Sequence, residues 1–203
     1  MLIRVLGLIK IMTIKSNSLP DELDSPFYIA NKRFSEEFEK YIIERNGQVK
    51  GEFNAWAFFV SGKINDPKEW LLSYKKSNYT SLGTIPILQS EKQYKDYVLS
   101  LISKWETRLE GYGTLKIRRK SIWDVFMLLL NNNTNLHIEN RNYIVFSSKD
   151  NQELLQKLTA VLRPFFDSEE VFQVILKKNI LSIQISSDGH HFDIFEKLET
   201  KIN

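Results

Sequence analysis

The sequence contains no cysteine among its 203 residues. This absence excludes disulfide bonds, thiolate zinc sites, iron–sulfur clusters and a cysteine nucleophile. A chain without thiols suits a reducing compartment, so we expect a cytoplasmic protein.

Long hydrophobic runs are also missing. The segment Met1–Met12 is apolar, but Arg4 and Lys10 interrupt it well short of the ~20 residues that a membrane-crossing helix needs. No small-residue cleavage site follows it, which argues against a signal peptide. Two interpretations stay open. The segment is an N-terminal strand or a membrane-surface segment that gives peripheral membrane contact, or translation starts at Met12.

Motifs that hold cofactors or nucleophiles are absent as well. The eight glycines are scattered and form neither a GxGxxG nor a GxxxxGK[ST] phosphate loop, and no GxSxG elbow occurs. The formal net charge is only +3, with basic and acidic residues interspersed, which disfavours nucleic acid as a partner. We therefore expect no cofactor.

Aromatic and aliphatic residues are plentiful, since hydrophobic side chains make up 42% of the chain. This is enough for a sizeable core, and the length suits one domain over 1–203. Residues 1–26 are expected to be irregular or extended, and the softest boundary lies at 131–133. Hairpins alternate with helices after that point. This order predicts an α+β fold, with a mostly antiparallel sheet and helices packed chiefly on one face.

Apolar spacing predicts the elements of the first half. Phe34, Phe38 and Ile42 recur at helical spacing. The aromatic stretch 53–59 suggests a ligand pocket or, preferably, a central strand buried on both faces. The predicted elements are a helix from Ala30 to a stop at Asn46-Gly47, a strand over 48–64 bent at Gly51, a short helix over 68–72 opened by Asp66-Pro67, a strand over 79–88, and a long helix over 90–109 opened by a Ser90/Gln93 capping box.

The second half combines short strands with capped helices. The predicted elements are a half-exposed strand over 114–120, an apolar core helix over 121–130 opened by Ser121 and Asp124, strands over 135–139 and 142–148, a helix opened by Asp150 and Glu153 and ended by Arg163-Pro164, a hairpin of 171–177 and 180–187 turning at Lys178-Asn179, and a last helix from about His191.

One cluster of metal-ligand residue types occurs, Asp188-Gly189-His190-His191-Phe192-Asp193. In a helix starting at His190, this residue and Asp193 share a face, so His190, His191 and Asp193 are candidate ligands of a divalent-metal-dependent hydrolase. The alternative is structural. In that interpretation Asp188-Gly189 turns the chain, and Asp193 complements the dipole of the last helix.

One basic run occurs, formed by Lys116, Arg118, Arg119 and Lys120. Such a run binds phosphate groups, which makes the chain a candidate binder of anionic lipid or nucleic acid. The favoured alternative is that strand alternation places Lys116, Arg118 and Lys120 on a solvated face without any partner.

The C-terminal third resembles an uncharacterised bacterial family. In that family a glutamate precedes a strand of the form F-x-V-x-S-x-D, a helix with L-T-P follows, and then a two-stranded hairpin. The matching residues here are Glu139, Tyr143, Val145, Ser147, Asp150, Leu158 and Thr159, with Ala160 in place of the proline. The resemblance implies an α+β fold and no site residues. Members usually carry N-terminal membrane helices, and no stretch of this sequence has that character.

These observations lead to one expectation and two alternatives. The absence of catalytic motifs favours a non-enzymatic binding or regulatory module that acts through a protein partner. The alternatives are a metal-dependent hydrolase that uses residues 188–193 and an anion binder that uses residues 116–120. The sequence does not specify an oligomeric state.

Overall fold

The computed structural model describes residues 13–79, 98–121, 124, 138, 140–147, 151–186 and 188–202. Its elements, in chain order, are β1 (Lys15–Ser16), the 3-10 helix η1 (Pro20–Glu22), α1 (Pro26–Glu44), β2 (Gln48–Phe53), β3 (Phe58–Ile64), β4 (Trp70–Tyr79), β5 (Val98–Arg108), β6 (Leu115–Arg119), β7 (Tyr143–Ser147), α3 (Gln152–Asp167), β8 (Val171–Lys177), β9 (Ile180–Ser186) and α4 (Phe192–Ile202).

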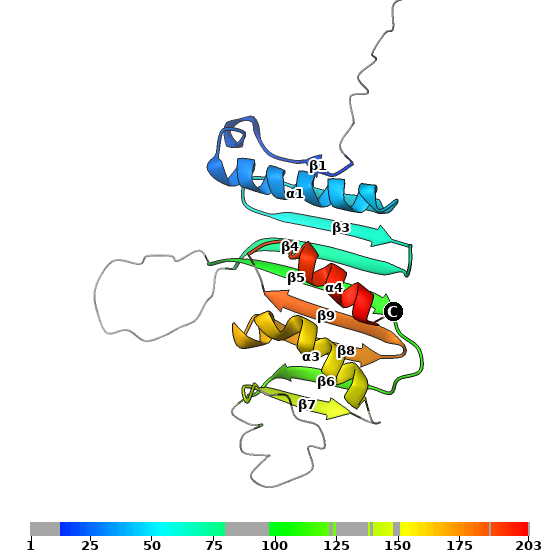
Figure 1. Ribbon diagram of the computed structural model, residues 1–203. Helices are drawn as coiled ribbons and strands as arrows, with labels where there is room; N and C mark the ends of the chain where they lie inside the picture. Colours follow the sequence, from blue (N-terminus) through cyan, green and yellow to red (C-terminus); the bar gives the residue numbers. More distant parts are fainter. Residues whose placement is uncertain are drawn as a thin grey trace, which may run out of the picture.

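The nine strands of the described residues lie in one sheet, in the order β1-β2-β3-β4-β5-β9-β8-β6-β7. Only the short pair β1–β2 is parallel, and every other neighbouring pair is antiparallel. Helices α1, α3 and α4 pack against the same face of this sheet (Figure 1). The predicted α+β fold, with a mostly antiparallel sheet and helices on one face, is confirmed.

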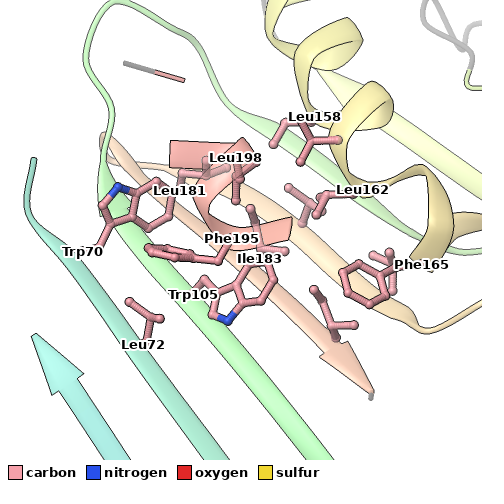
Figure 2. Close-up of a cluster of buried hydrophobic side chains, with 14 of the residues drawn as sticks. Trp70, Leu72, Trp105, Leu158, Leu162, Phe165, Leu181, Ile183, Phe195 and Leu198 are labelled. Atoms are coloured by element: carbon pink, nitrogen blue, oxygen red, sulfur yellow. The ribbon is translucent and has the colours of Figure 1, made fainter. Parts of the chain in front are cut away.

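The core lies between the sheet and its three helices. Strand residues alternate, so that every second side chain of a strand points into this layer. The ring of Phe195 from α4 packs edge-on against Trp70 at 5.2 Å and against Trp105 at 5.6 Å between ring centroids. Leucines of α3 and α4 close over these rings (Figure 2). The aromatic rings therefore join α4 to β4 and β5 at the middle of the sheet.

The structure corrects the prediction of a single strand over 48–64. This segment is a hairpin of β2 and β3, turned by residues 54–57. The side-chain Oδ1 of Asn54 accepts hydrogen bonds from the backbone N–H groups of Trp56 and Ala57, which closes the turn. The stretch 53–59 is therefore not a central strand buried on both faces. Phe53 and Phe58 are buried, whereas Trp56 and Phe59 are about half exposed.

The predicted long helix over 90–109 is wrong for its described part, because residues 98–108 form strand β5. Ser103, Trp105 and Thr107 are buried in strict alternation, and Lys104 and Glu106 between them are partly exposed. The Thr107 hydroxyl donates to the carbonyl oxygen of Glu69 at 2.6 Å, so a polar residue stands in the core face. The apolar residues of this segment recur at helical spacing, which suggested a helix. The alternation typical of a strand was hidden, because the polar residues Ser103 and Thr107 occupy two of the buried positions.

Smaller corrections concern element ends. Residues 70–72 begin β4 instead of ending a short helix. Helix α3 continues past Pro164 to Asp167, and its N-cap is Asn151. Asn46, not Gly47, adopts the left-handed conformation after α1, with φ of 55°. A Cβ on Gly47 would lie 2.5 Å from the Lys63 carbonyl oxygen, so this glycine permits close approach.

Several predicted elements are confirmed, and others lie outside the described residues. Helix α1, strands β6 and β7, the β8–β9 hairpin and helix α4 occur where they are expected. Lys178 and Asn179 turn the hairpin with φ of 52° and 61°. The elements predicted over 80–97, 125–137 and 148–150 are not described. No helix among the described residues has the length and apolar character needed to cross a membrane.

Close packing of α1 on β3 gives the first testable prediction. A Cβ on Gly62 would lie 2.5 Å from Ile42 Cγ1 and 2.9 Å from Phe38 Cζ, and both of these side chains are fully buried. We expect Gly62→Ala to lower the free energy of unfolding in urea by about 1–3 kcal/mol, because the added methyl overpacks this contact.

The matched control is Gly189→Ala, where the nearest heavy atom would lie 3.8 Å from the new Cβ. An ordinary contact of this kind changes the free energy of unfolding by less than about 0.5 kcal/mol. Equal effects of the two substitutions would contradict the close packing of α1 on the sheet.

Candidate functional site

His190, the first candidate ligand, lies in the connection between β9 and α4 and packs among aromatic rings. Its imidazole stacks on Phe34 at 3.6 Å and on Phe192 at 4.6 Å between ring centroids. Its Nε2 lies 3.0 Å from the Phe34 carbonyl oxygen, and the Tyr74 hydroxyl donates to the His190 carbonyl oxygen at 2.8 Å. Through these contacts, His190 connects α1 and α4 to the sheet.

Burial sets the charge of this imidazole. Only 9% of the His190 side chain is exposed. Desolvation lowers the pKa of His190 to about 4, although the Phe34 carbonyl and the Glu37 carboxylate oppose the shift. The imidazole is therefore neutral at pH 7, and one of its nitrogens is engaged with backbone.

His191 and Asp193 point to other partners. The His191 ring meets Phe165 edge-on at 4.9 Å, and its Nε2 lies 3.5 Å from Asp188 Oδ1. Asp193 is exposed and lies 3.6 Å from Lys197 Nζ. Helix α4 begins at Phe192 instead of His190, so the helical spacing assumed for a shared face does not apply. Nowhere in the described ranges do three His, Cys, Asp or Glu side chains gather as metal ligands would.

The predicted basic run lies at the far end of the sheet from α1, with Lys116, Arg118 and Arg119 on β6 and Lys120 directly after it. Arg118 is not without a partner, which corrects the prediction of a solvated, unpaired side chain. Its guanidinium forms a two-pronged pair with Asp124, with Nη2 at 2.7 Å from Oδ1, and lies 5.4 Å from the Phe146 ring centroid. This pair and hydrogen bonds from Ser121 hold the pKa of Asp124 far below its usual range.

The other members of the run differ in their surroundings. Arg119 Nη1 lies 3.9 Å from Glu169 Oε2, whereas Lys116 is exposed. Two of the four cations therefore have a carboxylate close by. Strand register instead connects Lys116 and Arg118 to a much wider surface on the side of the sheet that faces away from the helices.

We call this surface the open face, because none of the helices α1, α3 and α4 packs on it (Figure 1). Paired residues of neighbouring strands point to the same side, so the register determines which side chains it carries. Its acidic strand residues are Glu52 and Glu106. Its basic strand residues are Lys15, Lys50, Lys63, Lys75, Lys104, Arg108, Lys116, Arg118 and Lys177.

Ion pairs reduce this positive charge without removing it. Four of the nine basic residues pair with carboxylates, in the pairs Lys63–Glu69, Lys104–Glu106, Arg108–Glu110 and Arg118–Asp124. Glu69, Glu110 and Asp124 lie outside the strands, so nine basic and five acidic groups leave an excess of four positive charges. On the other side, the three helices carry seven basic and nine acidic residues, and Arg45 and Lys76, which contact these helices, bring the two charges into balance.

Large apolar side chains accompany the charges on the open face. Phe59, Leu71, Phe146 and Ile180 are between 37% and 51% exposed. Leu71 lies next to Glu106 in the register, and Ile180 lies between Arg108 and Lys177. The open face thus combines apolar side chains with basic ones.

A second exposed surface lies where α1 begins and β2 turns into β3. We call it the Trp56 patch, and it consists of Leu19, Leu23, Phe27 and Trp56, which are between 44% and 63% exposed. The rings of Phe27 and Trp56 lie 5.7 Å apart, and the indole N–H of Trp56 donates to Glu22 Oε1 at 2.9 Å. The patch therefore joins η1, α1 and the β2–β3 turn.

Buried polar contacts fix the turn that carries Trp56. The side chain of Asn31, which is buried in α1, donates to the carbonyl oxygens of Asn54 at 2.9 Å and Ala55 at 3.1 Å. Its Oδ1 accepts a hydrogen bond from Lys76 Nζ at 2.9 Å. Sequence reasoning missed this patch, because the aromatic run around Trp56 was interpreted as core. Asn54 within that run was the available signal of a turn.

Comparison of the chain with family models, with curated proteins and with solved structures finds no match in any of the three. The resemblance of the C-terminal third to a bacterial family stays a prediction. The function of the chain is therefore inferred from its two exposed surfaces, the open face and the Trp56 patch.

The buried imidazole gives a prediction about pH. His190 has a pKa of about 4 in the folded protein and about 6.5 when unfolded, so the unfolded state binds the proton first. The contribution of the neutral imidazole to the free energy of unfolding is then fully present above about pH 6.5. It is lost as the pH decreases towards about 4, by about 3 kcal/mol in total. Urea unfolding between pH 7.5 and 4 measures this loss.

The variant His190→Gln lacks the titrating group. Its free energy of unfolding should therefore decrease between pH 6.5 and 4 by about 3 kcal/mol less than that of the wild type. Glutamine keeps an N–H donor for the Phe34 carbonyl oxygen. An unchanged pH dependence in this variant would show that other groups cause the acid loss.

Proposed function

We propose that this chain is a non-enzymatic binding module that acts through a protein partner, and that the Trp56 patch is its contact surface. The observation that carries the proposal is the exposed Phe27–Trp56 ring pair at 5.7 Å, held open to solvent by hydrogen bonds. Exposed apolar patches rimmed by polar residues mark interaction sites on soluble proteins.

The energetic argument rests on the two rings. Trp and Phe each bury a large area when they are covered, and two half-exposed rings leave on the order of 200 Å² of apolar surface in water. Covering that area contributes about 5 kcal/mol before the entropy of association is subtracted. Tryptophan is also among the residue types that dominate the energies of protein interfaces.

Preorganisation reduces the entropy lost on binding. The Asn54 side chain closes the turn, Asn31 ties that turn to α1, and Glu22 orients the indole of Trp56. Because these groups already hold the rings in place, little side-chain freedom is lost when a partner covers them.

The charges around the Trp56 patch indicate which kind of partner would fit it. Asp21, Glu22 and Asp24 lie in the segment that carries Leu19 and Leu23. A partner with an apolar pocket and basic residues at its rim complements this surface. We place this interaction in the cytoplasm because the chain has no cysteine, and peripheral membrane contact stays an alternative setting.

The other two functions have less support. The hydrolase proposal needs His190, His191 and Asp193 at one ion, yet these side chains contact Phe34, Phe165 and Lys197 respectively. Anion binding by the run 116–120 is weakened because Arg118 already pairs with Asp124. Neither arrangement supplies a preformed site of the kind that the Trp56 patch offers.

Site-specific photocross-linking in cells tests the proposal. A benzophenone amino acid replaces Leu19, at the rim of the patch, and a control chain carries it at Lys197, an exposed position on α4. We expect one discrete protein adduct from position 19 and none from position 197. Trp56→Ala should abolish this adduct, because the ring supplies the main anchor.

The same variant needs a folding control, since loss of binding must not reflect unfolding. Trp56 is half exposed, so Trp56→Ala should lower the free energy of unfolding by about 1 kcal/mol or less. The proposal fails if the adduct persists in Trp56→Ala, or if the control position gives the same adduct.

A further inference from the structure

We infer that the open face is a second binding surface, independent of the Trp56 patch, and that it binds an acidic protein surface. Its excess of four positive charges contrasts with the helix side, where nine basic and nine acidic groups balance when Arg45 and Lys76 are included. The positive charge is thus concentrated on the open face, although the whole sequence carries only +3.

The positive charge comes chiefly from five lysines. Among the described residues, these lysines form no ion pair, and most of them are exposed. They are spread over five strands of the open face: Lys15, Lys50, Lys75, Lys116 and Lys177. A charge spread of this kind attracts an acidic partner and orients it before contact.

The size of the open face matches that of a protein interface. Nine strands spaced by about 4.8 Å span about 38 Å, and about six residues along each strand span about 20 Å. The resulting area is roughly 750 Å², close to the ~800 Å² that each partner contributes to a standard interface. Leu71 and Ile180 supply exposed apolar contacts within it.

A face-to-face dimer of the chain does not fit this surface. Two open faces stacked on each other would bring like charges together over the whole area, and like-charge contacts disfavour association. The occupant that we propose is therefore a different molecule with the opposite charge.

Nucleic acid fits less well than protein. Phe59 lies on β3 and Phe146 on β7, six strand spacings or about 29 Å apart, so these rings do not form a platform on which successive bases stack. Glu106 also lies on β5 in the middle of the sheet and would repel phosphates. An acidic protein can place an uncharged residue opposite Glu106 and its carboxylates opposite the lysines.

The test compares two charge-reversal variants of the full chain. The open-face variant carries Lys50→Glu, Lys75→Glu, Lys116→Glu and Lys177→Glu. The matched control carries Lys32→Glu, Lys40→Glu, Lys197→Glu and Lys201→Glu on the exposed sides of α1 and α4. Both variants change the net charge equally, and circular dichroism confirms that each is folded.

Four probes separate the occupants: poly-L-glutamate, a glutamate–tyrosine copolymer of equal charge, poly(U) RNA, and vesicles of phosphatidylserine and phosphatidylcholine. At low salt we expect the wild type to bind both polypeptides, with the copolymer bound at least about threefold more tightly through its aromatic rings. The open-face variant should bind at least about tenfold more weakly, and the control within about threefold of wild type.

Three results would overturn the inference. The first is that wild type binds neither polypeptide. The second is that the control variant loses as much affinity as the open-face variant, which shows that net charge alone governs binding. The third is that RNA or vesicles bind more tightly than both polypeptides, with the loss confined to the open-face variant. That result assigns the open face to nucleic acid or to anionic lipid.

Discussion

The fold depends on the packing of three helices, α1, α3 and α4, on one face of a nine-stranded sheet. None of these helices packs on the other face. Helices α1, α3 and α4 all lie on the same side, so the fully buried apolar side chains of the strands, such as Trp70, Leu72 and Ile183, point to that side. The rings of Trp70, Trp105 and Phe195 connect the sheet to α4 at the centre of this layer. Burial of these large rings supplies much of the driving force for folding.

This one-sided packing also determines where function can reside. His190 is used to join α1 and α4 to the sheet, and its burial keeps it neutral at pH 7. The two histidines that suggested chemistry, His190 and His191, therefore pack against aromatic rings. The surfaces that we propose for binding are the Trp56 patch and the open face, where large apolar side chains stay in contact with water beside charged groups.

Local signals predicted the elements that need no long-range partner. Lys178-Asn179 specified a tight hairpin, and both residues adopt positive φ. Strand β5 was missed because Ser103 and Thr107 occupy core positions, and only pairing with β4 and β9 shows this. The candidate site was harder to predict. The charge of the open face is visible only after the register of all nine strands is known, and the contact of Arg118 with Asp124 depends on tertiary placement.

Hydroxyl-radical footprinting of the free protein tests the division of the sheet into a covered and an open face most directly. If the account is right, Phe59 on the open face is oxidised at a rate similar to that of Phe27, which is equally exposed, and Leu71 is oxidised much faster than the buried Leu72. Trp105 and Phe195 on the covered face stay protected, although tryptophan is intrinsically reactive. Protection of Phe59 and Leu71 to the level of the core would contradict the account, because it would mean that the second face is also covered.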